Sequence, residues 1–249
     1  MSGHSKWSTI KRKKGVLDAK RGKIFTKIGR DIMTAARMGG GDPSGNPSLR
    51  LALAAARAAN MPKDNQERAI KKGTGELEGV EIEEAVYEGR GPKGTAWVVE
   101  VLTDNKNRTV ADLRNAFSKA GGELGASGSV MWMFDYTGVI TIAKAKIDED
   151  TLTERVLELG GSDVKDGGED WIVLCDSRDF IALQTGLEDL APSSAERQYL
   201  AKADSVLAMT GDDAVKCAQF MAKLDELEDV QMVFTNADLP DDVLQEHGP

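Results

Sequence analysis

The hydrophobic pattern changes near residue 78, and this change constrains the fold more than any other feature of the 249-residue sequence. Before it, apolar residues recur at helical spacing between breaks rich in Gly and Pro. After it, short runs rich in Val, Ile and aromatic residues alternate with helical segments. The sequence therefore predicts a helical N-terminal part followed by α/β structure.

Three helices are expected before the change. The first covers residues 18–38 and ends at a run of three glycines. The second covers residues 47–61, with Asn46 as its N-cap and a proline at its first position. Pro62 ends it, and the third helix follows over residues 63–73. Three helices in about 60 residues would form a small bundle.

The first helix has two distinct faces on a helical wheel. Its apolar face would pack into the bundle, and its other face would form a cationic stripe. The apolar members are Ile24, Phe25, Ile28, Ile32, Ala35 and Ala36, and the cationic members are Lys20, Lys23, Lys27, Arg30 and Arg37.

Strands and helices alternate through the rest of the chain. Strands are expected at residues 82–89, 95–103, 129–134, 138–143, 170–175, 195–200, 204–209 and 230–236, with helices at 107–122, 150–161, 177–190 and 212–227. In the first of these helices, the residues expected to face inward are Val110, Leu113, Phe117 and Ala120.

The fold class expected from this order is α+β: an N-terminal three-helix bundle followed by two small α/β (ferredoxin-like) domains, one inserted in the other. The basic helical domain would cover residues 1–78. The first α/β domain would be discontinuous, over residues 79–135 and 204–240, and the inserted α/β domain would cover 136–203.

Charge is divided unequally between these parts. Residues 1–75 contain 17 Lys and Arg against five Asp and Glu, whereas residues 76–249 contain 15 against 36. The formal net charge of the whole chain is -9. A basic domain is attracted to polyphosphate and an acidic one is repelled by it, so contact with a polyanion would be directional.

Nucleic-acid binding through the N-terminal domain is the function that this charge favours, because Lys and Arg displace the counterions condensed on phosphates. Four adjacent cations, residues 11–14, repel one another unless a polyanion lies beside them. The candidate nucleic-acid-binding residues are Lys6, Trp7, Lys11, Arg12, Lys13, Lys14, Lys20, Arg21, Lys23, Lys27 and Arg30.

Other interpretations of the basic segment stay open. It could be a solvated face that only aids solubility, and Trp7 could pack against the bundle rather than stack on a base. The second and third helices resemble a helix-turn-helix only weakly. Membrane-surface binding is disfavoured, because the apolar face of the first helix is mostly Ile and Ala, as a bundle core requires.

Catalytic chemistry finds little support in the sequence. The two histidines, His4 and His247, lie near the chain ends, and neither a metal site nor a cofactor site is expected. Cys175 and Cys217 fall in apolar runs, which predicts buried thiols. Residues 89–94, GRGPKG, match a dinucleotide fingerprint but precede a strand, so a turn is expected. We expect no enzyme.

Localisation and carboxylate roles follow from composition. The N-terminus has charge but no apolar stretch behind it, and no apolar run could span a bilayer, so a cytoplasmic protein without membrane contact is expected. Most carboxylate clusters fall at expected helix N-termini, where they complement the helix dipole, or on a solvated face.

Several blocks closely resemble the YebC/PmpR family, nearly from end to end. They include MSGHSKW, AKRGKIFTKIGRDI, GGGDPSGNPSLRLAL, AANMPKDNQERAIKKGTGE, YEGRGPKG, LTDNKNRTVADLRNAFSKAGGELGASGSV and LEDVQMVFTNAD. The mitochondrial translational activators of cytochrome oxidase look like relatives of the same group. The blocks MWMFDY and LAPSSAERQYLAKADSVLAM are less typical.

The resemblance implies a cytoplasmic three-domain protein and leaves two functions. One is a DNA-binding transcriptional regulator, which we take first. The other is a ribosome-associated translation factor that relieves stalling or activates translation. The partners would be DNA, or ribosomal or other RNA, at the basic domain, and proteins at the acidic α/β domains. The matching blocks contain Lys6, Trp7, Lys11, Lys20, Arg21, Lys23 and Lys27 among the candidate contacts.

Overall fold

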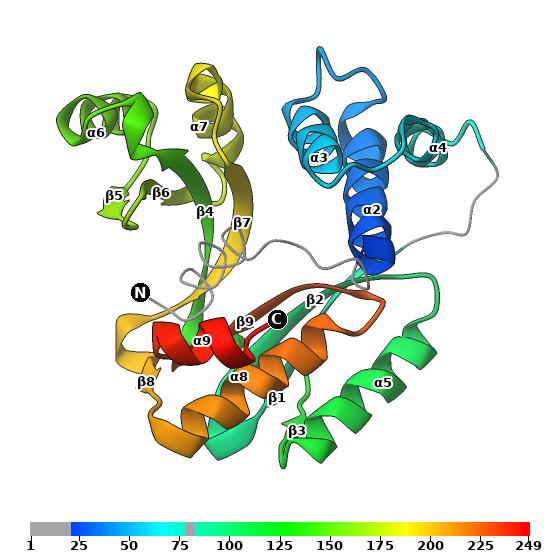
Figure 1. Cartoon of the computed structure of the whole chain (residues 1–249), viewed down its shortest axis with the longest axis vertical. Coiled ribbons are helices and arrows are strands. Elements are labelled where there is room, and N and C mark those ends of the chain that lie inside the picture. Colours follow the sequence, from blue (N-terminus) through cyan, green and yellow to red (C-terminus); the bar gives the residue numbers. More distant parts are fainter. Residues whose placement is uncertain (1–20, 78–82) are drawn as a thin grey trace. The chain divides into compact units, whose positions relative to one another are not determined.

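The computed structural model describes residues 21–77 and 83–249, with the side chains of the first helix from Ile24 onward. The chain forms two compact units, which are described separately (Figure 1). The described part of one unit consists of helices only, and residues 83–249 form the other, which contains the sheets. The α+β class expected from the sequence is therefore confirmed.

The helical unit is built on α2 (Arg21–Gly39), against which α3 (Pro47–Ala58) and α4 (Lys63–Gly73) pack. Its core contains Ile32 and Ala36 of α2 together with Leu49 of α3, all at most 1 % exposed. Phe25 and Ile28 pack partly buried against this core. The apolar face expected for the first helix is therefore confirmed over the described residues.

Four strands form the first sheet of the larger unit, in the order β3-β1-β2-β9. They are β1 (Glu83–Arg90), β2 (Ala96–Thr103), β3 (Glu123–Leu124) and β9 (Val230–Thr235), and every pair is antiparallel. The hairpin of β1 and β2 takes the two central positions.

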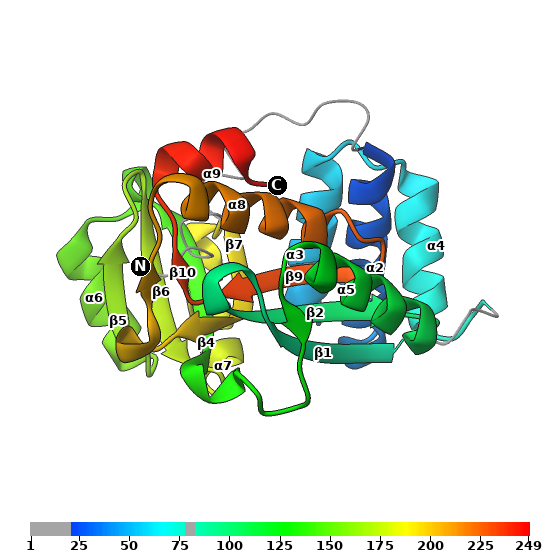
Figure 2. The same cartoon turned by 90° about the horizontal axis from the view of Figure 1, so that it is seen from below.

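Two helices, α5 (Lys106–Lys119) and α8 (Gly211–Asp225), lie along one face of this sheet (Figure 2). Side chains on β2 alternate between the two faces. Trp97, Val99 and Val101 face these helices, whereas Ala96 and Val98 belong to a second core on the opposite face. The short C-terminal helix α9 (Asp241–His247) adds Leu244 to the helix-side core.

The second sheet has the order β5-β6-β4-β7, again with antiparallel neighbours throughout. Its strands are β4 (Phe134–Ala143), β5 (Asp163–Asp166), β6 (Asp170–Asp176) and β7 (Ser194–Ala201). With α6 (Glu149–Glu158) and α7 (Phe180–Gly186), the chain order is β-α-β-β-α-β, which is the ferredoxin-like arrangement. β4 runs unbroken past residue 135, where the sequence predicted a domain boundary.

Two expected strands are wrong. Residues 129–134 contain the short 3-10 helix η3 (Met131–Met133), and β4 begins only at Phe134. The cause is Glu88, which accepts hydrogen bonds from the backbone N–H groups of Gly128, Val130 and Met131 at 2.7–3.0 Å and so folds this segment into a turn.

The other wrong strand is residues 204–209. This segment holds a 3-10 turn, η6 (Ala203–Ser205), and only two residues of strand, β8 (Leu207–Ala208). β8 pairs in parallel with β10 (Ala237–Asp238). The Nδ2 group of Asn236 donates to the Ser205 carbonyl at 2.6 Å, which holds the turn against the end of β9.

Among the described helices, none is both long and apolar enough to cross a membrane.

Candidate nucleic-acid interface

The structure describes only part of the candidate binding surface. Lys6, Trp7, Lys11, Arg12, Lys13, Lys14 and Lys20 lie outside the described residues. Arg21 and Lys23 lie in the first turns of α2, where only the backbone is described. Lys27 is half-buried on α2.

Arg30 does not lie on an open cationic stripe. Its exposed fraction is 8 %, although it falls on the side of the helical wheel expected to face solvent. Arg30 also interacts with at least one other group of the structure. The wheel failed here because it describes one isolated helix, whereas burial depends on everything that packs around the helix. The proposed binding role of Arg30 stays a prediction.

A second set of cations lies on α4 and was missed in the sequence analysis. Arg68, Lys71 and Lys72 are exposed, and their spacing of three and four residues places them on one helical face, which we name the α4 cationic face. Ala69, which lies beside this face, is buried in the bundle core. The block RAIKK shows this pattern, because its basic residues flank the apolar pair.

The position of this face depends on close packing at Gly73. A Cβ atom at Gly73 would lie 2.4 Å from the Met33 carbonyl oxygen of α2 and 2.8 Å from the Ala36 side chain. Real Cβ atoms do not approach so closely, so only glycine allows the end of α4 to contact α2 in this way. Gly73 therefore places the last turn of α4, which carries Lys71 and Lys72, directly against α2.

Asn46 organises the loop between α2 and α3. Its Oδ1 atom accepts from the Leu49 N–H at 3.0 Å, which confirms the expected N-cap. Its Nδ2 group donates to the carbonyls of Ala35 at 2.8 Å and Gly40 at 2.9 Å. The side chain is buried, so all three bonds are shielded from water. This one residue therefore joins two helices and the glycine-rich turn.

A charge network centred on the buried Asp229 stabilises the larger unit. Asp229 is 4 % exposed and accepts hydrogen bonds from Arg108 at 2.8 Å and from the hydroxyl groups of Thr109 at 2.7 Å and Thr103 at 3.2 Å. Asn105 caps the same helix through the N–H of Arg108. The blocks LTDNKNRTVADL and LEDV thus meet in a structural site that joins β2, α5 and β9.

Glu100 lies on β2, on the face opposite α5 and α8. Burial, together with the negative charges of Glu196 and Glu84, raises the pKa of Glu100 to about 7. The same carboxylate and burial raise the pKa of Tyr199 to about 12. Tyr199 also stacks against Tyr136, with ring centroids 4.6 Å apart. Within this acidic unit, Glu100 is therefore a half-buried acid that is partly protonated at neutral pH.

The remaining motifs have structural explanations. GRGPKG forms the tight connection between β1 and β2, with the Gly91 N–H donating to the Thr95 carbonyl at 2.8 Å, so the expected turn is confirmed. Cys175 and Cys217 are buried, as expected. Asp148 caps α6 through the Thr151 N–H at 3.0 Å. Over the described ranges, no group of three or more His, Cys, Asp or Glu residues could hold a metal ion.

Comparison with known proteins identifies two matching family models. The model described as the TACO1/YebC protein N-terminal domain matches residues 5–76, and the model described as the TACO1/YebC second and third domain matches residues 82–237.

Similar proteins cover nearly the whole chain. A protein of Desulforapulum autotrophicum is 55 % identical over 98 % of both chains, and a protein of Treponema pallidum is 50 % identical over 98 % of this chain and 100 % of its own. Each is named a probable transcriptional regulatory protein. The crystal structure of a conserved hypothetical protein from Aquifex aeolicus has a TM-score of 0.79 at 40 % identity, covering 92 % of this chain and 95 % of that one.

Proposed function

The chain belongs to the TACO1/YebC family, and from this premise we propose that it is a nucleic-acid-binding regulator of gene expression, specifically a DNA-binding transcriptional regulator. The names of its relatives support a regulatory role. The observation that favours nucleic acid is the α4 cationic face, where Arg68, Lys71 and Lys72 are exposed on one side of a helix.

The charge distribution indicates which part of the chain would contact the nucleic acid. The described residues of the helical unit, 21–77, contain 11 Lys and Arg against five Asp and Glu, whereas residues 83–249 contain 15 against 33. Phosphate attracts the first set and repels the second. In our proposal the helical unit, together with the basic N-terminal residues, binds the nucleic-acid backbone, and the acidic α/β part stays available to protein partners. The protein acts in the cytoplasm, without catalysis.

A ribosome-associated translation factor is the second candidate. It is favoured by the chemistry of the α4 cationic face, because contacts from its cations to phosphate carry no sequence information. The same surface would therefore bind ribosomal RNA as readily as duplex DNA.

The test compares three forms of the full chain: wild type, Lys71→Gln with Lys72→Gln, and Lys165→Gln with Lys202→Gln. The last pair removes the same charge from exposed positions on or beside the second sheet. Binding to a promoter duplex selected from genomic fragments is measured by fluorescence anisotropy across a salt series. We expect the α4 variant to reduce the slope of log K against log salt by about 1.8, since each duplex phosphate contact contributes about 0.9. Equal slopes for all three proteins would refute binding through α4.

The class of target is decided separately. A transcriptional regulator should prefer one duplex over competitor DNA at about 150 mM salt, where non-specific contacts weaken. A translation factor should instead co-sediment with ribosomes. The double variant Lys11→Glu with Lys23→Glu should then no longer appear in the ribosome fraction. Equal binding to every duplex, together with ribosome co-sedimentation, would replace the first function by the second.

A further inference from the structure

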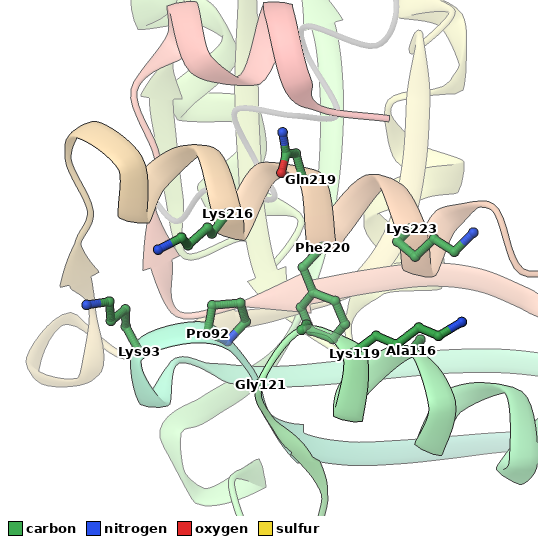
Figure 3. Close-up of a pocket in the computed structure, with 10 residues that line it drawn as sticks. Pro92, Lys93, Ala116, Lys119, Gly121, Lys216, Gln219, Phe220 and Lys223 are labelled. Atoms are coloured by element: carbon green, nitrogen blue, oxygen red, sulfur yellow. The ribbon is translucent and has the colours of Figure 1, made fainter.

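A groove lined by four lysines lies in the acidic unit, on the helix-covered side of the first sheet. Its volume is about 630 Å³, and it lies between α5, α8 and the turn η2 (Pro92–Gly94) that connects β1 to β2. Lys93, Lys119, Lys216 and Lys223 surround it, and Figure 3 shows these side chains at its two ends with Phe220 and Pro92 between them. Although separated in sequence, the four cations converge at one place.

This convergence is unusual for the charge of the unit. Residues 83–249 have 33 acidic and 15 basic side chains, yet four of those 15 line one groove and no carboxylate residue lines it. Cations gathered in this way repel one another unless an anion lies between them. A solvated surface would be expected to intersperse the two signs. The groove is therefore a local anion-attracting site within a repulsive surface.

Its nearby carboxylates are too few to neutralise it. Asp213 contacts both Lys93, at 3.3 Å, and Lys216, at 4.0 Å, and Glu226 contacts Lys223 at 3.2 Å. All these side chains are more than one-third exposed, and such pairs contribute only about 0–1 kcal/mol each. Within the described residues, Lys119 forms no ion pair. An incoming phosphate can therefore take over these lysines at little cost.

Lys93 has a backbone conformation that its side chain disfavours. Its φ is 59°, in the left-handed region that costs a residue with a Cβ atom about 1–2 kcal/mol relative to the right-handed one. Glycine would occupy this position of the turn without strain. The chain has glycine directly after it, at Gly94 with φ 75°, but places lysine here. A strained residue of this turn therefore carries a cation to the edge of the groove.

The spacing of the lysines suits a linear polyanion. Lys216 and Lys223 are seven residues apart on α8, so they share one face and their Cα atoms are about 10.5 Å apart along the axis. One nucleic-acid strand places a phosphate roughly every 3.4 Å along its helix axis, so this distance spans about three phosphates. Gln219 between them adds an amide that can donate to a phosphate oxygen.

We propose that the groove bounded by Lys93, Lys119, Lys216 and Lys223 is a second nucleic-acid site, which binds a phosphodiester strand through its backbone. The lysines contact phosphates at intervals along the strand, and the apolar floor of Pro92 and Phe220 excludes water beneath them. This inference rests on the proposed function for the identity of the polyanion. It departs from the expectation that the acidic unit is repelled everywhere by polyphosphate.

The test uses the full chain and single-stranded 30-nucleotide probes of one sequence, as RNA and as DNA, with polyglutamate of 30 residues as a third probe. The groove variant is Lys119→Gln with Lys223→Gln. The matched control is Lys165→Gln with Lys202→Gln, whose lysines also form exposed pairs with aspartates, at 3.6 and 3.7 Å. A charge-conserving variant, Lys119→Arg with Lys223→Arg, shows whether charge or side-chain shape is responsible. Thermal unfolding of every variant checks the fold.

We expect the groove variant to bind about tenfold more weakly at about 0.1 M salt and to lower the salt slope by about 1.4, because each single-strand phosphate contact contributes about 0.7. The matched control and the arginine variant should bind like wild type. An RNA-specific loss would identify RNA as the strand, a DNA-specific loss would identify DNA, and equal losses would indicate backbone recognition alone.

Unchanged slopes for both oligonucleotides would overturn the inference, as would a loss confined to polyglutamate, which would indicate an acidic protein partner. The two proposals fail differently. If Lys71→Gln with Lys72→Gln weakens binding and the groove variant does not, only the second site is refuted. If the groove variant alone weakens binding, the proposed role of α4 is refuted. If wild type binds neither oligonucleotide, both proposals fall.

Discussion

Replacing Glu100 with glutamine should stabilise the protein at neutral pH and should remove part of its pH dependence. Burial and the charges of Glu196 and Glu84 raise the pKa of Glu100 from its ordinary value of 4.5 to about 7 in the folded state. The folded protein therefore holds a proton that the unfolded chain releases between these two values. Folding stability must decrease as pH rises through this window and become level above it.

The size of this effect follows from the two pKa values. Each unit corresponds to about 1.4 kcal/mol, so the window from 4.5 to about 7 corresponds to at most about 3.4 kcal/mol. Between about pH 5 and pH 8 the linkage relation gives a loss of about 2.5 kcal/mol for the glutamate. Glutamine keeps the shape and carries no charge. The stability difference between variant and wild type should therefore grow with pH by about 1.5–2.5 kcal/mol over that range.

Urea unfolding of both proteins at four pH values between about 5 and 8 measures this difference, and the comparison cancels the titration of every group that does not interact with Glu100. The lowered pKa of Asp176, about 2, lies below this range and does not interfere. Glu158→Gln, which removes an exposed carboxylate from α6, is the control and should show a constant difference. A constant difference for Glu100→Gln as well would refute the burial and repulsion assigned to this carboxylate.

Two stability predictions concern the polar groups that join elements. Asn46→Ala should lower the unfolding free energy of the helical unit by about 2–3 kcal/mol, since it removes an N-cap and two further hydrogen bonds, and urea unfolding against the exposed Ser44→Ala checks it. Arg108→Ala should cost about 2–3 kcal/mol, because Asp229 stays buried with its charge uncompensated. Its control is the exposed Arg114→Ala on the same helix, and equal unfolding midpoints for the two would contradict the network.

The order of helices and strands could be predicted because it depends on local patterns. Asn46 followed by proline marks the start of a helix, and Gly73 after a basic turn marks the end of one. Both signals act within a few residues. The segment MWMF failed for a non-local reason. Its alternation resembles a strand, but Glu88, more than 40 residues earlier, takes up the backbone N–H groups that a strand would use.

The candidate sites were less predictable, because a surface is composed of residues that the fold brings together. The cationic run in the N-terminal sequence is conspicuous since its members are adjacent, whereas the groove lysines are separated by up to 130 residues and each lies in an ordinary stretch. Arg30 shows the opposite error, because a helical wheel assigned it to solvent and the structure buries it. The net charge of a segment thus predicts that it attracts a polyanion, but it does not predict which residues form the contact surface.

The distribution of lysines in the acidic unit has a consequence for how the protein would hold nucleic acid. A strand bound at the helical unit alone would meet net repulsion from the -18 of residues 83–249 wherever it extended over them. An anion-attracting groove in that unit would determine where the strand crosses it, because the strand is attracted at the groove and repelled by the acidic surface elsewhere. Two weak sites on one chain reinforce each other when one strand reaches both, since binding at the first then raises the effective concentration at the second.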